Sequence, residues 1–194
     1  MTVRGVIFDM DGTLVDSMLD FEAIRSDMGL PSGQPILEAL ANMPAGEEKD
    51  RSLAVLREHE LRGASRATLM PGVEAALAEL SQRKIQQGIL TRNSREATDM
   101  VVSGLELSFS MVLTREDAPA KPDPQGLLDI SQEWDLPPSE LLFVGDFLFD
   151  MQAGRRAGMQ SVLYMPKDVP SYVEESDFQI RHFDELILLI LRQE

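Results

Sequence analysis

Short, largely apolar segments with the character of strands alternate with longer helical patterns along most of this chain of 194 residues. The segments are bounded by turn residues, which is typical of buried strands. They lie at 3–8, 85–91, 111–113, 141–145 and 161–164, and 178–180 is a candidate edge strand. Between them, apolar residues three and four positions apart predict helices, and Asp184 is the expected N-cap of the last one. Strands alternating with helices favour an α/β fold with a mostly parallel sheet covered by helices on both faces.

The segment 17–68 has helical patterns and no strand pattern. Met18, Phe21, Ile24 and Met28 recur at helical spacing until Gly29 ends the run. Two further helical patterns follow, over 35–40 and 46–61. We therefore expect a core domain of residues 1–16 and 69–194, with an all-helical subdomain of residues 17–68 inserted after the first strand. An insertion at this point is well placed to act as a lid.

Composition narrows the class of protein further. Hydrophobic residues make up 43% of the chain, enough for one core domain with a modest insertion. The net charge of −15 argues against nucleic acid or an anionic membrane as partner. The absence of cysteine excludes disulfides, thiolate zinc sites and thiol nucleophiles. No signal-peptide pattern is visible, and the longest apolar run, 186–191, is too short to span a bilayer, so we expect a cytoplasmic protein.

Polar side chains gather where the predicted strands end. The carboxyl ends of parallel strands share one edge of the sheet, which is where α/β folds bind ligands. Each of these residues alone has a common structural role, as a helix cap, a strand-end hydroxyl or a solvated lysine. Together they form one candidate site: Asp9 and Asp11 before Gly12, then Thr91, Arg92 and Asn93, then Lys121 between prolines, then Asp146 and Asp150.

These residue types suit phosphoryl transfer. Asp9, Asp11 and Asp146 can supply the oxygen ligands that Mg²⁺ prefers. Mg²⁺ and Lys121 would offset the charges of the carboxylates and the phosphate, and Thr91 could donate to a phosphate oxygen. One carboxylate can act as nucleophile through an aspartyl-phosphate, and a second can exchange protons with the leaving group and water.

Four segments in this order resemble the haloacid dehalogenase superfamily. They are 9–17 (DMDGTLVDS), 90–93 (LTRN), 121–124 (KPDP) and 145–150 (GDFLFD). The resemblance implies that Asp9 is the nucleophile and Asp11 the general acid/base. It implies phosphate binding by Thr91 and Lys121, with Arg92 and Asn93 as further candidates for phosphate binding or specificity. It also implies a Mg²⁺ site formed by Asp9, the Asp11 backbone carbonyl and Asp146, with Asp150 assisting or bonding Lys121.

The same resemblance implies a Rossmann-like three-layer core and a small helical cap, as in the phosphoglycolate phosphatase-like branch. The expected activity is a Mg²⁺-dependent phosphatase of small phosphomonoesters, with a small phosphorylated metabolite as partner and the oligomeric state open. Two features depart from the family pattern. Phe147 stands where small polar residues are common, and the cap is short. Arg25 and Arg62 of the cap are further specificity candidates, whereas His59 and His182 match no motif.

Two other functions stay open at this point. A phosphomutase shares the first chemical step and differs in whether water or a sugar hydroxyl accepts the phosphoryl group. A phosphoaspartate signalling module also uses an acidic cluster, a Thr and a Lys, but its phosphorylated Asp follows the acidic pair on a later strand. Here Asp9 and Asp11 open the chain, and the helical insertion favours an enzyme.

Overall fold

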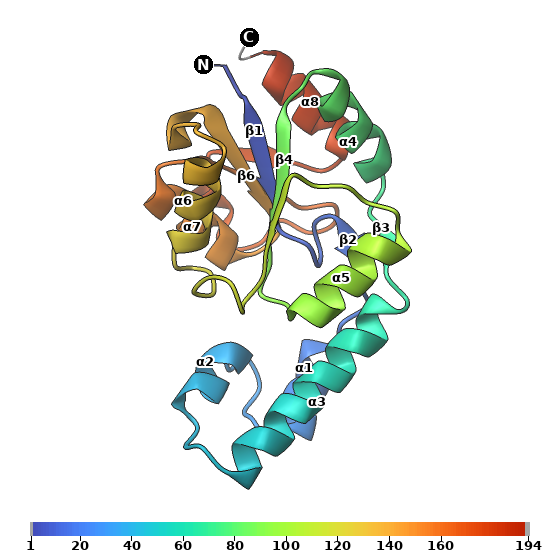
Figure 1. Ribbon diagram of the computed structural model, residues 1–194, viewed down its shortest axis with the longest axis vertical. Helices are drawn as coiled ribbons and strands as arrows, with labels where there is room; N and C mark the ends of the chain where they lie inside the picture. The colour runs from blue at the N-terminus through green and yellow to red at the C-terminus, as the bar shows by residue number, and fades with distance from the viewer. Residues whose placement is uncertain (1, 193–194) are drawn as a thin grey trace.

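The computed structural model describes residues 2–192 and contains a parallel sheet at its centre (Figure 1). Within these residues the sheet has six strands in the order β5-β4-β1-β6-β7-β8, and every neighbouring pair is parallel. The strands are β1 (Gly5–Phe8), β4 (Gln86–Leu90), β5 (Met111–Leu113), β6 (Leu141–Gly145), β7 (Gln160–Tyr164) and β8 (Phe178–Ile180). The predicted α/β fold is confirmed, and β8 is an edge strand as expected.

Helices cover both faces of this sheet (Figure 1). One face carries α4 (Val73–Gln82), α5 (Arg95–Gly104) and α8 (Phe183–Leu191), and the other carries α6 (Gln125–Glu133) and α7 (Leu148–Ala157). The cause is the alternation of side chains along each strand. In β1, Val6 and Phe8 pack into the core of the first face and Ile7 into that of the second. A strand that is apolar on both sides needs helices on both sides, which gives the three layers.

Three further helices lie together beyond the edge of the sheet where its strands end (Figure 1). They are α1 (Phe21–Asp27), α2 (Ile36–Asn42) and α3 (Glu47–Ala64), and with their connections we call them the helical lobe. The lobe has its own small apolar core of Ile24, Ile36, Leu40 and Leu56. This separate core lets the lobe hold its shape without contributing strands to the main sheet.

Two short strands join the lobe to the core. β2 (Val15–Asp16) pairs antiparallel with β3 (Thr68–Leu69), so the chain leaves and re-enters the core at neighbouring points. The sequence indicated no strand at either place. A strand of two residues is too short for an alternating pattern to be visible.

Two local predictions were wrong. Met18 does not belong to the first helix: its φ is 52° and its side chain is 71% exposed. α1 begins after Asp20, whose carboxylate accepts hydrogen bonds from the backbone N–H groups of Glu22 and Ala23. This local capping bond fixes the start of the helix more strongly than an apolar residue three positions before Phe21 can.

The second error is the cap of α8. The N-cap residue is His182, whose Nδ1 accepts from the Asp184 N–H at 3.2 Å. The imidazole also lies over Gly72 at the start of α4, where a Cβ would approach its ring to 2.6 Å. His182, which matches no sequence motif, therefore contacts the N-terminal ends of both α8 and α4.

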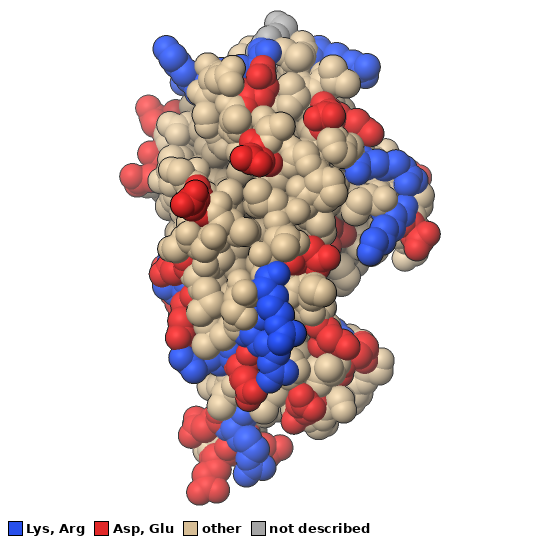
Figure 2. All heavy atoms as spheres, turned by 90° about the vertical axis from the view of Figure 1, so that its right-hand side faces the viewer, with Lys and Arg blue, Asp and Glu red and all other residues tan. Residues whose placement is uncertain are grey.

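Charged side chains of both signs mix on the face formed by α3, α4, α5 and α8 (Figure 2). Several of them form ion pairs within hydrogen-bonding distance, such as Arg57 with Glu96 at 2.6 Å and Arg83 with Glu79 at 2.7 Å. Of the helices within residues 2–192, none combines the length and apolarity needed to cross a membrane.

Candidate active site

The site begins at the turn that follows β1. The Met10 carbonyl accepts from the Val15 N–H at 3.0 Å, so the chain reverses within a few residues. Gly12 makes this possible with a φ of 81°. A Cβ on Gly12 would lie 2.3 Å from Oδ2 of Asp146. The glycine therefore permits both the turn and the close approach of the Asp146 carboxylate.

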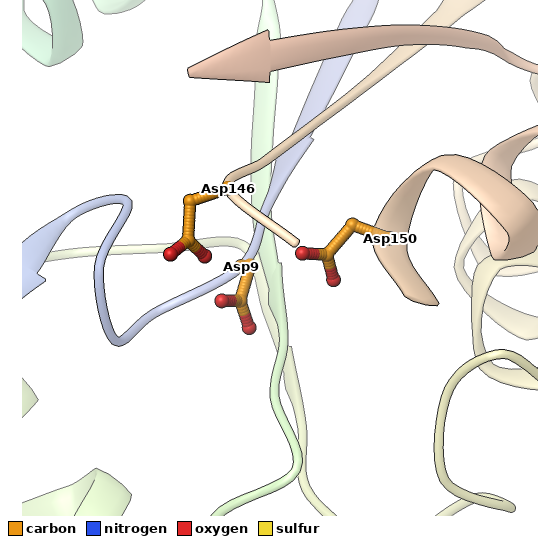
Figure 3. Close-up of side chains that lie close together, drawn as sticks. All are labelled: Asp9, Asp146 and Asp150. Atoms are coloured by element: carbon orange, nitrogen blue, oxygen red, sulfur yellow. The ribbon is translucent and has the colours of Figure 1, made fainter. Parts of the chain in front are cut away.

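Three carboxylates from three segments meet beside this turn (Figure 3). Asp9 follows β1, Asp146 follows β6, and Asp150 lies in the first turn of α7, where its Oδ2 accepts from the Phe147 N–H at 2.9 Å. One oxygen of each carboxylate lies within 4.8 Å of the others. Three carboxylate oxygens this close together match the hard, oxygen-only ligand set of Mg²⁺. The residues present therefore fit a divalent cation.

Lys121 bridges two of these acids. Its Nζ lies 2.5 Å from Oδ1 of Asp9 and 2.7 Å from Oδ1 of Asp150, and its side chain is buried. Burial lowers the pKa of Lys121, but Asp150 and Asp9 raise it, and the net result is a raised pKa. The lysine therefore stays charged and offsets part of the negative charge of the cluster.

The remaining charge shifts the acids themselves. Burial raises the pKa of Asp9 to about 7; Lys121 lowers it and Asp150 adds to the rise. Burial also raises the pKa of Asp146 well above its usual range, and the charges of Asp9 and Asp150 raise it further. Like charges in a buried site resist ionising together. A cation bound among these oxygens would remove that resistance.

Asp11 lies beside the cluster and has different partners. Ser17 Oγ donates to its Oδ1, and Asn93 Nδ2 donates to its Oδ2 at 2.5 Å. Burial raises the pKa of Asp11, and the hydrogen bonds from Ser17 and Asn93 oppose this rise. Both partners are uncharged, so Asp11 lacks the cationic contact that Asp9 has. This environment suits a carboxyl group that exchanges a proton.

The segment after β4 brings three predicted residues to the site. The Asn93 N–H donates to the buried Thr91 Oγ1 at 3.1 Å, which orders this short loop. The Asn93 side-chain amide donates to the Asp11 carboxylate. Arg92 Nη2 donates to both carboxylate oxygens of Glu38 in the helical lobe, at 2.9 and 2.8 Å. Thr91, Arg92 and Asn93 are therefore neighbours in the sequence that bond three different partners.

The geometry can be compared with known proteins. A family model described as haloacid dehalogenase-like hydrolase matches residues 19–164. The chain belongs to this family. The matched range begins after Asp9 and Asp11, so the first acidic pair is placed by the structure and not by this match.

Individual relatives of this haloacid dehalogenase-like hydrolase span most of the chain. A haloacid dehalogenase-like hydrolase domain-containing protein of Arabidopsis thaliana is 34% identical over 92% of this chain and 80% of its own. The pyrophosphatase PpaX of Oceanobacillus iheyensis is 28% identical over 98% of both chains. Other relatives are named phosphatases of phosphoglycolate and of N-acetylmuramic acid 6-phosphate. A crystal structure of a predicted phosphoglycolate phosphatase from Haemophilus somnus has a TM-score of 0.77 at 19% identity, covering 96% of this chain and 97% of that one, so the two share the fold.

Several contacts of this hydrolase had no signal in the sequence. Glu60 of α3 is buried and paired with Arg115 of the core, Nη2 to Oε2 at 3.0 Å. The Tyr172 hydroxyl donates to the Asp146 carbonyl at 3.0 Å. Both join segments that are far apart in the chain, and neither lies in a motif. Ser17 was visible at the end of the first motif, but only the fold shows that it holds Asp11.

The two lobe arginines considered for specificity have partners within the lobe. Arg25 pairs with Glu22 at 2.6 Å and donates to the Gln34 carbonyl at 2.8 Å. Arg62 pairs with Glu58 at 2.5 Å on an exposed helix face. Glu38 of α2, by contrast, contacts a predicted site residue directly, because both of its carboxylate oxygens accept from Arg92.

Proposed function

We propose that this haloacid dehalogenase-like hydrolase is a Mg²⁺-dependent phosphatase of small phosphomonoesters that works through an aspartyl-phosphate on Asp9. The observation that carries the proposal is the cluster of Asp9, Asp146 and Asp150 bridged by Lys121, with Asp11 beside it. The names of the relatives, which include phosphatases and a pyrophosphatase, support the reaction class.

Asp9, Asp146 and the Asp11 backbone carbonyl would hold Mg²⁺, with Asp150 assisting while it bonds Lys121. When bound, the ion supplies positive charge that favours ionised carboxylates and screens the phosphoryl group. Lys121 supplies the other positive charge, and Thr91 offers its hydroxyl to a phosphoryl oxygen. Positive groups and donors arranged before the reaction stabilise the charge of phosphoryl transfer.

The first half-reaction forms the covalent intermediate. An ionised oxygen of Asp9 attacks phosphorus, the bond to the ester oxygen breaks, and the leaving alkoxide takes a proton from Asp11. Asp11 is able to donate because burial favours its protonated form. Ser17 and Asn93 hold its two oxygens and so fix the direction of this transfer.

The second half-reaction restores the enzyme. Asp11, now ionised, accepts a proton from water, and the water oxygen attacks phosphorus. The bond between phosphorus and Asp9 breaks, which releases phosphate. One residue thus acts first as acid and then as base, while Asp9 carries the phosphoryl group between the two steps.

The helical lobe acts as a cap over this site, with residues 17–68 as the inserted subdomain and 1–16 with 69–194 as the core. Three ion pairs of the lobe with the core support this role: Arg92 with Glu38, Arg115 with Glu60, and Arg57 with Glu96. A cap that reaches the loops after the strands can exclude water and select the leaving group.

The alternatives predict different products. A phosphomutase would pass the phosphoryl group from Asp9 to a second hydroxyl of the substrate, giving an isomer and little free phosphate. A signalling module would keep the phosphoryl group without turnover; the family of hydrolases to which the chain belongs favours an enzyme. A cytoplasmic location stays a prediction from the sequence.

The direct test is the metal dependence of phosphate release. We expect release from 4-nitrophenyl phosphate and from a panel of phosphorylated metabolites with Mg²⁺, and none in excess chelator. Ca²⁺ should restore little activity, because it accepts more ligands and can hold the second oxygen of Asp9. Asp9→Asn is the matched control and should be inactive with every metal. Full activity of the wild type in chelator would refute the proposal.

A further inference from the structure

An ion pair between the helical lobe and the core lies at the edge of the proposed site. Arg92 Nη2 contacts both carboxylate oxygens of Glu38 in α2, at 2.9 and 2.8 Å. Its Nη1 donates to the Lys121 backbone carbonyl at 2.5 Å, and its guanidinium lies 4.9 Å from the centre of the Phe149 ring. Arg92 therefore touches the segments that carry Lys121 and Asp150 and holds a lobe carboxylate against them.

This pair lies on the side to which a leaving group would point. In phosphoryl transfer the attacking and leaving oxygens lie roughly in line on opposite sides of phosphorus. With Asp9 as nucleophile at the strand ends, the leaving group extends away from the sheet. The helical lobe occupies that side (Figure 1). Glu38 is the lobe carboxylate that contacts the Arg92 side chain directly, whereas Glu60 reaches the same loop through Arg115, which donates to the Arg92 backbone carbonyl.

The basic groups at this junction already have acidic partners. Arg92 is paired with Glu38, Arg115 with the buried Glu60, and Lys121 with Asp9 and Asp150. Of the three, Arg92 has the most exposed side chain, at 22%, and its partner Glu38 is 43% exposed. A negatively charged leaving group that approached Arg92 would have to displace Glu38 or lie beside it.

We infer that Glu38 makes the site select phosphomonoesters whose leaving group is uncharged or cationic over those whose leaving group carries a carboxylate. This inference rests on the proposed phosphatase function and concerns its substrate class. The physical basis is charge repulsion: a substrate is rejected when binding it forces like charges together. The aromatic groups beside the pair suit an uncharged leaving group. Phe147 is half exposed and contacts Phe149 and Tyr172 edge-on, with centroids 5.2 and 5.7 Å apart.

This selectivity would differ from that of relatives named for phosphoglycolate and N-acetylmuramic acid 6-phosphate, since both compounds carry a carboxyl group. Glu38 pairs with Arg92, which could otherwise bind the carboxylate of such a substrate. Removing the charge of Glu38 should then free Arg92 for an anionic leaving group.

The test uses three substrates of matched length that differ in charge at one end: 2-phosphoglycolate, 2-hydroxyethyl phosphate and phosphoethanolamine. The kcat/KM of each is measured with Mg²⁺ for the wild type, Glu38→Gln and Glu58→Gln. Glu58 is the matched control, because it also lies in the lobe and pairs with an arginine, Arg62, on an exposed helix face. Glu38→Ala is a second variant that removes the carboxylate without leaving an amide.

We expect the wild type to prefer the uncharged and cationic esters. In both Glu38 variants the ratio of kcat/KM for 2-phosphoglycolate to that for 2-hydroxyethyl phosphate should rise about tenfold, as expected for one charge a few ångströms away that water largely screens. Glu58→Gln should leave this ratio unchanged. The inference is overturned if the wild type hydrolyses 2-phosphoglycolate as well as the neutral ester, or if the Glu38 variants change all three substrates equally. Absence of hydrolysis of these esters and of 4-nitrophenyl phosphate by the wild type overturns the proposed phosphatase itself.

Discussion

Asp9 and Asp11 are the same residue type two positions apart, and their surroundings divide their roles. Asp9 contacts the ammonium group of Lys121 at 2.5 Å, which favours its ionised form against the effect of burial. Asp11 is held by Ser17 and Asn93, which carry no charge. Burial raises the pKa of both carboxyl groups, so the difference between them lies in their partners. Two carboxyl groups whose environments differ in this way can act as nucleophile and proton donor.

Replacing Asp11 by Asn tests this division. The new amide can keep both hydrogen bonds, since its oxygen can accept from Asn93 and its NH₂ can donate to the Ser17 hydroxyl. It can neither give nor take a proton. Turnover of alkyl phosphates should therefore fall by about 10² to 10⁴-fold, the usual contribution of general acid–base catalysis.

With an aryl phosphate the first step needs little acid help, because a phenolate leaves easily. We expect an initial burst of phenol followed by slow turnover, and mass spectrometry of the quenched protein should find one added phosphoryl group. The control is the double variant Asp9→Asn, Asp11→Asn, which should carry none. If the Asp11→Asn variant turned over alkyl phosphates as fast as the wild type does, Asp11 would not be the general acid and base. A wild-type protein that holds the phosphoryl group for minutes without turnover would support the signalling alternative.

At the scale of elements, the chain leaves the core for the lobe and returns through one short strand pair, β2–β3. In the β2–β3 pair, Val15 is opposite Leu69 and Asp16 is opposite Thr68. The two ends of the lobe therefore lie side by side, and an Asn-Gly turn from Asp16 to Thr68 could close the chain as a hairpin. The lobe contributes no strand to the main sheet and has a small apolar core of its own, although Leu61 and Ala64 at the end of α3 pack into the main core.

We expect the protein with this hairpin in place of the lobe to fold. It should keep weak activity on 4-nitrophenyl phosphate, because the residues proposed for the chemical steps lie outside the lobe, apart from Ser17. Selectivity among phosphorylated metabolites should be lost, since Glu38 is removed. Circular dichroism and thermal melting check the fold, and kcat/KM over a substrate panel checks selectivity. Selectivity equal to that of the intact protein would show that the lobe does not choose the substrate.

Elements with strong local patterns could be predicted from the sequence. β6 lies at 141–145 as predicted, because four consecutive apolar residues and Gly145 lie between turn residues. β2 and β3 are too short for a pattern, and the start of α1 depends on the capping bond of Asp20. The gathering of Asp9, Asp146 and Asp150 could be predicted because parallel strands end at one edge. Glu38 could not, because it meets Arg92 across 54 positions of sequence without a shared motif.

At the scale of the whole molecule, the net negative charge of the protein opposes the approach of an anionic substrate such as a phosphate ester. The net charge is −15, and acidic and basic side chains lie interspersed on the face of the molecule shown in Figure 2. Attraction for phosphate therefore depends on local positive charge at the site, from Lys121 and a bound cation. The same acidic cluster that needs a cation also costs stability without one, because buried like charges repel.

This cost gives a prediction about pH and stability. Burial raises the pKa of Asp9 to about 7 in the folded, metal-free protein, above its ordinary value of 3.8, and the pKa of Asp146 is raised as well. Between about pH 4 and pH 7 the folded state therefore binds more protons than the unfolded state. Its stability must fall as pH rises through this range, by linkage. Mg²⁺ needs ionised carboxylates, so its binding releases protons and is stronger at high pH.

The measurement is the melting temperature with Mg²⁺ minus that in chelator, at a series of pH values from 5.5 to 8. Taking this difference at each pH cancels the titration of groups away from the metal.

At a hundred times its Kd a ligand raises the free energy of unfolding by about 2.7 kcal/mol, which for a chain of this size raises the melting temperature by roughly 5–10 °C. We expect a shift of that size at pH 8 and a much smaller one at pH 5.5. Asp146→Asn should abolish most of the shift. Asp129→Asn, a change at a half-buried carboxylate of α6 that accepts from Gln125 and is not part of the cluster, should leave it intact. A shift that is equal at both ends of the pH range, or larger at pH 5.5, would mean that Mg²⁺ does not bind through these buried carboxylates.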